Sequence, residues 1–393
     1  MALVEAIAAR ADELTDWRRD LHGFPELAFE EVRTASFVAE KLRAFGCDEV
    51  HEGIAGTGVV AVIRGRAPGR SIALRADMDA LPIHEESGAV WASATPRLMH
   101  GCGHDGHTTM LLAAVRNLAV TRAFAGTVVA IFQPAEEVGR GARAMLEAGL
   151  FTRFPAELVF GLHNVPAIPL GCFVVQPGPV MAAVADWRAT VTGKGAHAAL
   201  PQLGIDPVVA AAHVVLALQT LVSREIDPTL PALVTVGAIQ GGAADNVIPD
   251  RVELRGTSRW LDDAAGELLQ RRLPEIVALT AAAHGARGEL VFAEPTIPAT
   301  VNEPAATDLA RTAAAAVVGA DGVLAPTRPI GLVAEDFAFM LQAKPGCFVL
   351  IGTGRTDDDP MLHNPRYDFN DDALALGASF WVRLVETVSG PAG

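Results

Sequence analysis

The densest group of chemistry-bearing side chains lies in the segment MHGCGHDGHTTM, residues 99–110. Within eight residues it holds Cys102, Asp105 and three histidines, His100, His104 and His107. The glycines between them let the backbone bend so that several side chains converge. A cysteine thiolate and imidazole nitrogens are natural ligands for zinc and similar divalent ions. The segment therefore favours a metal site over its alternative, a polar helix N-terminus with one catalytic or structural thiol.

Two adjacent carboxylates, Glu136 and Glu137, stand in the segment QPAEEVGRG after an apolar run. Neighbouring residues point their side chains in different directions, so one of the two can ligate a metal while the other faces a bound water. The alternative is a solvated acidic loop, because exposed glutamate pairs are common.

Further candidates follow other apolar runs. His163 stands in GLHNVP, and His363 stands in MLHNPRYDF before the last predicted helix. A lone histidine is usually a structural residue, but two His-Asn pairs in equivalent contexts favour a shared site. Asp77 and Asp79 in ALRADMDALP either form caps and turns or orient a ligating histidine.

From these candidates we take one thiolate, three imidazoles and one or two carboxylates as the set of metal ligands. That is too many ligands for one tetrahedral ion, and it suits two ions that share a bridging group. The sequence has no G-x-S-x-G elbow, no P-loop and no G-x-G-x-x-G after a strand, so no rival catalytic scaffold is indicated.

The candidates follow strands that alternate with helices. The apolar pattern predicts strands at 58–65, 71–81, 127–133 and 157–164, and helices within 2–46 and at 107–119 and 139–150. This alternation predicts an α/β fold with a helix-flanked, mostly parallel sheet. Ligands bind at the carboxyl ends of the strands in such sheets, which is where the candidates stand.

The pattern changes in the second half of the 393 residues, a length typical of two or three domains. Residues 186–294 follow the order β-α-β-β-α-β, which is the ferredoxin-like unit. We therefore predict a discontinuous catalytic domain, 1–183 and 298–393, with a smaller α+β domain inserted at 184–297. The Gly/Pro-rich joints at 177–179 and 295–298 are the predicted hinges.

Nine ordered segments resemble the M20 metallopeptidase family, most closely its N-acyl-amino-acid amidohydrolases, which include hippurate hydrolases and auxin-conjugate hydrolases. They span essentially the whole chain: WRRDLHGFPELAFEE, RADMDALP, HGCGHDGH, FQPAEE, GLHN, GKGAHAALPQLGIDPV, DNVIPD, AEDFAFM and LHNPRYDF. The resemblance implies a dinuclear metal domain and an inserted ferredoxin-like lid that usually dimerises.

The resemblance also implies the roles of the site residues. The metal ligands would be Cys102, as the bridging thiolate, with Glu137 and His363 completing one ion's shell and His104 and His163 the other's. Glu136 would be the general base.

Other M20 branches usually have His-x-Asp where this chain has Asp77-Met78-Asp79. Asp77 is therefore not assumed to be a ligand, and His104 takes over that role. Asp79 is expected to orient a ligand.

Three residues of the inserted domain are expected to meet the substrate. His197, in GKGAHAA, is the family-implied oxyanion donor from the partner subunit's lid; by itself it would be interpreted as a turn histidine. Asn246 and Arg259 are candidates for binding the carboxylate of the amino-acid half, since arginine suits bidentate carboxylate capture. The alternative for Arg259 is a surface salt bridge.

The predicted activity is metal-dependent hydrolysis of the amide bond of N-acyl amino acids. The alternatives are a dipeptidase or carboxypeptidase-like M20 hydrolase and a non-enzymatic metal- or ligand-binding relative. The ligand types admit zinc, manganese, cobalt or nickel. A homodimer through the inserted domain is expected from the resemblance.

Composition restricts the other partners. The chain has 31 Lys+Arg against 46 Asp+Glu, a net charge of −15, which argues against nucleic-acid binding. The longest apolar run, residues 208–222, is interrupted by His213 and Gln219 and is shorter than the roughly 20 residues of a membrane span. With no secretory signal and no disulfide-framework spacing of the four cysteines, the expected location is the cytoplasm.

Overall fold

The computed structural model describes residues 1–324 and 331–389 and divides the chain into two compact units. The first unit comprises Met1–Val180, Val301–Arg328 and Asp336–Gly393, and the second comprises Met181–Thr300 and Pro329–Glu335. The predicted insertion, 184–297, lies within the second unit. The boundaries of the flanking segments stay a prediction, and residues 325–330 and 390–393 of the last segment lie outside the described residues.

An eight-stranded sheet forms the centre of the first unit, in the order β1-β2-β4-β3-β5-β16-β6-β15. Its four central strands, β4, β3, β5 and β16, run parallel to one another. β1 and β2 pair antiparallel with their neighbours, and β6 pairs antiparallel with β16 but parallel with β15. The predicted α/β class with a mostly parallel sheet is confirmed. The strands are β1 (Glu49–Ile54), β2 (Gly58–Arg64), β3 (Ala67–Asp77), β4 (Ala125–Gln133), β5 (Leu158–Pro169), β6 (Phe173–Val174), β15 (Val323–Leu324) and β16 (Gly346–Gly354).

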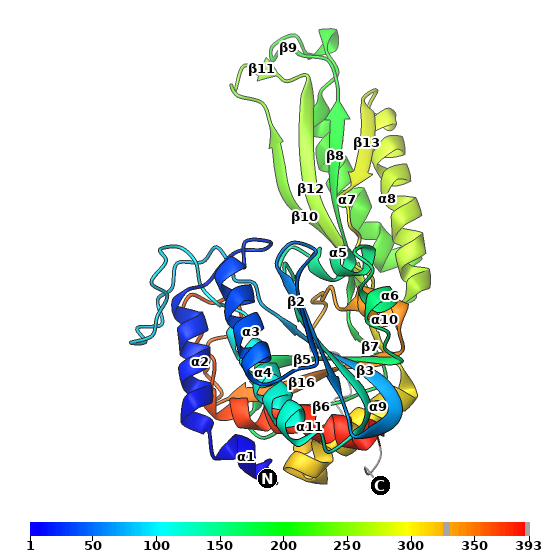
Figure 1. The fold of residues 1–393 in the computed structure, drawn as a ribbon. Helices are drawn as coiled ribbons and strands as arrows, with labels where there is room; N and C mark the ends of the chain where they lie inside the picture. Colours follow the sequence, from blue (N-terminus) through cyan, green and yellow to red (C-terminus); the bar gives the residue numbers. More distant parts are fainter. Residues whose placement is uncertain (325–330, 390–393) are drawn as a thin grey trace. The chain divides into compact units, whose positions relative to one another are not determined.

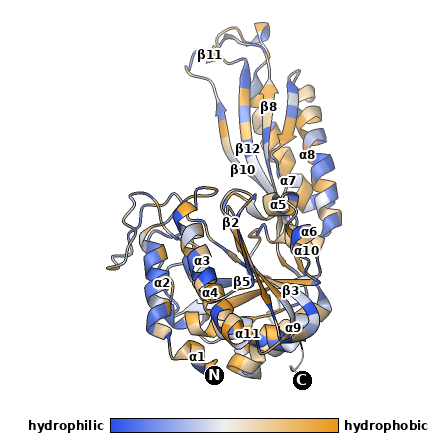
Figure 2. Cartoon of the chain, in the orientation of Figure 1, coloured by the Kyte–Doolittle hydropathy of each residue, from blue (hydrophilic) through white to orange (hydrophobic). Residues whose placement is uncertain are grey.

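Helices pack beside this sheet, and two of them, α4 and α11, contact β3 (Figure 1). Apolar residues dominate the central strands and both of these helices (Figure 2), which fits burial of the sheet on a common core. The helices are α1 (Glu5–Ala8), α2 (Ala11–Gly23), α3 (Val32–Ala44), α4 (His104–Thr121), α5 (Gly141–Glu147), α6 (Leu150–Arg153), α9 (Pro304–Val318), α10 (Ala338–Ala343) and α11 (Leu374–Ser389), with short 3₁₀ turns at η3 (Ala320–Gly322) and η4 (Asp371–Ala373).

The second unit has the predicted β-α-β-β-α-β order. Its antiparallel four-stranded sheet has the order β10-β12-β8-β13, which is the ferredoxin-like arrangement. Asp206 and Asp262 cap the two helices by accepting backbone hydrogen bonds in the first turn. The elements are β8 (Ala183–Thr192), α7 (Pro207–Thr220), β10 (Ala232–Gly241), β12 (Arg251–Trp260), α8 (Asp263–Ala283) and β13 (Arg287–Phe292), with a ribbon of β9 (Ala196–His197) and β11 (Val247–Ile248) and short helices η1 (Pro201–Leu203) and η2 (Leu221–Glu225).

A separate pair of strands, β7 (Gly178–Met181) and β14 (Thr300–Asn302), forms where the chain passes between the units.

Helix α7 continues into η2, so that Pro207–Glu225 is long and apolar enough to cross a membrane by length and composition alone. Its inner face, however, is part of the second unit's own core: Ala210, Val214 and Leu218 are fully buried there. A soluble protein's core helix passes the same test of length and composition.

Candidate metal centre

Two groups of three potential ligands share Cys102. In each group the ligand atoms lie within 4.8 Å of one another: Cys102 with His104 and His163, and Cys102 with Glu137 and His363. The sulfur of Cys102 is 3.5 Å from Nε2 of His163, and Nε2 of His363 is 3.4 Å from a carboxylate oxygen of Glu137. The structure thus brings together the five residues expected as ligands, in the two sets expected for two ions.

The sheet and α4 position four of these side chains. His104 is the first residue of α4, Cys102 stands two residues before it, and Glu137 follows the end of β4. His163 lies inside β5, opposite Leu350 of β16. The strand predicted at 157–164 continues past it to Pro169. The pairing of β5 with β3 ends at Gly161, so His163 still projects beyond the edge shared with β3.

Hydrogen bonds orient the ring nitrogens of two histidines toward the cluster. Nδ1 of His104 is 3.2 Å from a carboxylate oxygen of Asp79, and Nδ1 of His163 is 2.8 Å from the backbone oxygen of Asn164. When Nδ1 donates in these contacts, Nε2 carries a lone pair that is free to ligate. A carboxylate or carbonyl behind a metal-binding histidine is the usual arrangement.

The charges of the cluster are strongly coupled. Burial by itself lowers the pKa of His104, but the charge of Asp77 and the hydrogen bond to Asp79 outweigh burial and raise the pKa to about 10. Burial raises the pKa of Glu137 to about 7, against the charge of His104. Burial also holds the pKa of His163 well below its usual range. The carboxylates around His104 therefore favour a positive charge at the cluster, whereas the neighbouring ring of His163 stays neutral.

The residues present fit a divalent cation. Among the described residues, Nε2 of His104 and Oε1 of Glu137 are buried and have no hydrogen-bond partner. These two atoms lie 3.9 Å apart. Buried polar atoms that lack partners are costly, and a cation bound at each of the two ligand sets would remove that cost. Sulfur, imidazole nitrogen and carboxylate oxygen form a donor set that zinc and other transition ions accept.

Glu136 lies beside this cluster. One of its carboxylate oxygens is 4.0 Å from Nε2 of His104, and its side chain is 11% exposed. The backbone N–H of the next residue, Glu137, donates to Asp79, which also contacts His104. Asp79 thus connects the carboxylate turn after β4 with the start of α4, as expected for a residue that orients a ligand.

Asp77 is engaged by other groups. One of its oxygens accepts from the guanidinium of Arg75 at 2.7 Å, and the other lies 2.6 Å from Nδ1 of His107. Burial alone would raise the pKa of Asp77, but the charges of His104 and Arg75 hold it well below its usual range. Asp77 also forms a group of potential ligands with His104 and His107, so the expectation that it is not a ligand stays a prediction. Arg75 precedes Asp77 by two residues on β3, so both share one face of the strand.

His107, grouped above with the other histidines of its segment, forms a buried hydrogen-bonded chain behind the ligands with Asn164 and Tyr367, to which no motif assigned a role. Nε2 of His107 is 2.7 Å from Oδ1 of Asn164, and the Asn164 amide donates to the hydroxyl of Tyr367 at 2.7 Å. Gly103 packs against this chain with a φ of 87°, and a Cβ there would lie 2.7 Å from the Tyr367 hydroxyl. Only glycine meets both demands. The repeated His-Asn pair was the signal that could have revealed Asn164.

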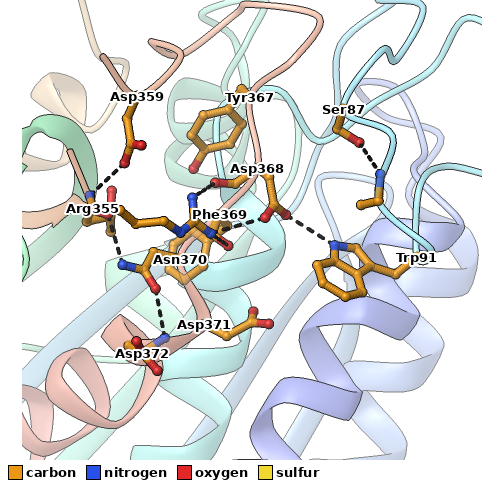
Figure 3. Close-up of polar contacts among 12 residues, drawn as sticks. Ser87, Trp91, Arg355, Asp359, Tyr367, Asp368, Phe369, Asn370, Asp371 and Asp372 are labelled. Carbon is orange, nitrogen blue, oxygen red and sulfur yellow. Dashed lines mark hydrogen bonds and ion pairs between the residues drawn. The ribbon is translucent and has the colours of Figure 1, made fainter. Parts of the chain in front are cut away.

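A hydrogen-bonded loop carries His363. Figure 3 shows Asp368 accepting from the indole of Trp91 and from the guanidinium of Arg355, both at 3.1 Å. Arg355 also donates to the backbone oxygen of Phe369 at 3.0 Å. His363 itself has a positive φ of 64°, and its backbone N–H donates to Gly101 at 2.8 Å. The loop is therefore joined directly to the segment that carries Cys102.

The remaining predicted residues belong to the second unit. His197 and Asn246 lie together at the β9–β11 ribbon: His197 pairs with Val247, and the backbone oxygen of Asn246 accepts from Ala198. Arg259 lies on β12 and donates to the backbone oxygen of Leu332 at 2.7 Å. The acceptor is a backbone carbonyl, so this hydrogen bond is neither the surface salt bridge named above as the alternative nor a contact with a carboxylate.

Comparison with known proteins decides the family. The family model described as peptidase family M20/M25/M40 matches residues 73–387. The chain belongs to this M20 family. It is 40% identical to an IAA-amino acid hydrolase (ILR1-like 5) of Arabidopsis thaliana, over 96% of this chain and 87% of that protein. It is 38% identical to hippurate hydrolase of Campylobacter jejuni, over 98% of both chains.

A solved structure gives the same result for the fold. A dinuclear metal-binding peptidase of the M20 family from Bacillus subtilis superposes with a TM-score of 0.84 at 34% identity, covering 98% of this M20 chain and 99% of that one. The expected resemblance to the M20 family is confirmed.

Proposed function

We propose that this M20 chain hydrolyses the amide bond of N-acyl amino acids and releases a carboxylic acid and a free amino acid. The observation that carries the proposal is the thiol of Cys102 shared between two ligand groups, with the carboxylate of Glu136 beside them. The similarity to enzymes named for hippurate and for IAA-amino acid conjugates supports this substrate class.

Two divalent cations are the proposed cofactors. His104 and His163 would hold one, Glu137 and His363 the other, and Cys102 would contact both. When bound, such cations lower the pKa of a water molecule and polarise the scissile carbonyl. Zinc, manganese, cobalt and nickel all suit this donor set.

Glu136 is the proposed general base and acid. Its carboxylate takes a proton from the attacking water as the water oxygen bonds to the amide carbon. It then returns that proton to the nitrogen as the C–N bond breaks, so the amine leaves neutral and the acyl group leaves as the acid. One carboxylate thus serves both proton transfers.

We also propose that three residues of the second unit contact the substrate. His197 is exposed, which suits a donor that stabilises the oxyanion of a bound substrate. Asn246, next to it on the same ribbon, and Arg259 are proposed to bind the free carboxylate of the amino-acid half.

The proposed assembly is a homodimer through the second unit. The side chains of Val208, Val209 and Leu216 on α7 are 44–67% exposed, which is unusual for one face of a helix in a monomer. β10 is also an edge strand of its sheet. We propose the cytoplasm as its location, because all four cysteines are free thiols, which suits a reducing compartment.

The family description favours a second candidate function, peptide hydrolysis by the same site. The test is a panel of N-acyl amino acids and dipeptides, assayed before and after chelation, with metal analysis of the same preparation. We expect hydrolysis of hippurate-like substrates that chelation abolishes and metal restores. Hydrolysis of dipeptides alone would favour the second candidate, and metal binding without any hydrolysis would indicate a binding protein.

The variant Glu136→Gln belongs to the same test. It should retain metal and lose turnover, because the amide cannot accept the proton of the water. If metal is lost together with activity, Glu136 is a ligand and not the base.

A further inference from the structure

The turn that carries Glu136 is held by backbone hydrogen bonds on both sides of that residue. The carbonyl of Glu136 accepts from Gly139 at 2.7 Å, and the carbonyl of Ala135 accepts from Gly141 at 3.0 Å. Ala135 is fully buried and has a φ of 55°, in the left-handed region that alanine rarely adopts. Such a conformation persists only where the surroundings fix it.

A buried carboxylate from the N-terminal part of the chain is one of the groups that hold Ala135 in this conformation. Oε1 of Glu31 accepts the backbone N–H of Ala135 at 2.8 Å and that of Phe29 at 3.0 Å. Its other oxygen accepts from the hydroxyl of Thr57. The residue Glu31 is 0% exposed. Asp79 binds the N–H of Glu137 in the same way, so a carboxylate oxygen accepts from the residue on each side of Glu136.

Glu31 does not make the hydrogen bond that a residue in its position at the start of a helix usually makes. Glu31 stands at the N-cap of α3, but its side chain accepts no capping hydrogen bond there. Glu26 does that instead, because its two oxygens accept the N–H groups of Arg33 and Thr34 in the first turn of α3. Glu31 is therefore available for the distant turn.

We propose that Glu31 is a positioning residue for the carboxylate of Glu136, acting through the backbone of Ala135. The inference rests on the proposed function, in which Glu136 moves the proton. Glu31 touches neither cations nor substrate in this account. Its loss lets the turn relax while the five ligand residues keep their places, so turnover falls more than metal binding or substrate affinity.

Two variants separate the hydrogen bond from the bulk of the side chain. Glu31→Leu keeps the volume but removes every acceptor, and we expect its kcat to fall roughly 100-fold, the effect of about 1 Å of misplacement in an active site. Glu31→Gln keeps a carbonyl oxygen for Ala135 and Phe29, and its kcat should stay within about threefold of wild type. In both, bound metal and KM should stay close to wild type.

Glu26→Leu is the matched control, because it removes two backbone hydrogen bonds from the same segment without touching the turn. It should lower the melting temperature about as much as Glu31→Leu yet keep the wild-type kcat. A Glu31→Leu variant with wild-type kcat, or Glu26→Leu and Glu31→Leu variants that lose kcat equally, would overturn the inference.

Two further variants keep the test decisive. If Glu31→Leu does not fold, Thr57→Val removes only the hydroxyl that orients Glu31, and kcat should fall by about threefold at constant KM; an unchanged kcat would overturn the inference. Glu136→Gln separates the two roles: turnover by that variant overturns the role of Glu136 as the base, whereas an inactive Glu136→Gln beside a fully active Glu31→Leu overturns only the role of Glu31.

Discussion

At the scale of single residues, the orientation of each ring and carboxylate decides what the centre can bind. Asp79 fixes His104, and a backbone carbonyl fixes His163, so both rings present Nε2 to the same place. Behind them, the chain from His107 through Asn164 to Tyr367 joins three segments that carry ligands. Partners of this kind usually matter almost as much as the ligands.

Tyr367→Phe tests that chain with the loss of one hydroxyl. The Asn164 amide then loses an acceptor in a buried place, and we expect metal affinity to fall about tenfold. Competition with a chromophoric chelator measures the affinity, and denaturant unfolding of the metal-free protein controls for general destabilisation. An unchanged affinity would remove Tyr367 from the support of the metal centre.

His197→Ala tests the proposed oxyanion donor. Removal of one such donor lowers kcat by roughly 100-fold or more, and metal content should not change. Steady-state kinetics and metal analysis of the purified variant check both expectations. A variant that turns over at the wild-type rate would reject this role for His197.

At the scale of elements, buried ion pairs join α2 to the start of α4 and to the loop that carries His363. Arg18 on α2 donates to Asp371 at 2.6 Å and lies 3.8 Å from Asp105. Nδ1 of His22 lies 2.8 Å from the same Asp105, and its Nε2 lies 3.2 Å from Glu85. The position of α4, and with it His104, thus depends on charges supplied by α2.

These charges predict how stability depends on pH. Burial lowers the pKa of His22, but the hydrogen bond and charge of Asp105 raise it to about 9. A raised pKa means that the protonated ring stabilises the fold fully below about pH 6.5 and that this contribution is lost as the pH rises through about 9. The pKa of Asp105 is lowered, despite burial, by its hydrogen bond to His22, so its contribution is lost in acid.

We therefore expect His22→Gln to destabilise the metal-free protein by roughly 3 kcal/mol near neutral pH and by much less at pH 10. Urea unfolding of both proteins between pH 6 and pH 10 measures the difference. A difference that does not change with pH would show that His22 contributes through packing and not through its charge.

At the scale of the whole molecule, local patterns predicted the elements well but not their long-range partners. The alternation of strands and helices gave the α/β class, and the β-α-β-β-α-β order gave the ferredoxin-like sheet. The insertion of β16 beside β5 was not predicted, because strand order depends on tertiary packing and leaves no local signal. The strand predicted at 157–164 likewise continues to Pro169 in the structure.

The site shows the same limit. Clustered residues such as Cys102 and His104 could be identified because glycines and ligand types concentrate in one segment. The Arg75–Asp77 pair had a signal in the two-residue period of a strand, which sequence analysis did not use. Glu31 had none, since a glutamate next to another glutamate at a helix start is typical of a solvated surface.

Whether Cys102 is shared by two cations is measured by the metal stoichiometry of the wild type and of one variant. Metal analysis after dialysis against a weak chelator should find about two equivalents per wild-type chain, because two ligand sets share the thiol. Cys102→Ser, which replaces the thiolate with a weak hydroxyl ligand, should lose most of both equivalents. Undiminished loading of Cys102→Ser would contradict the account, because it would remove the thiolate from the metal centre.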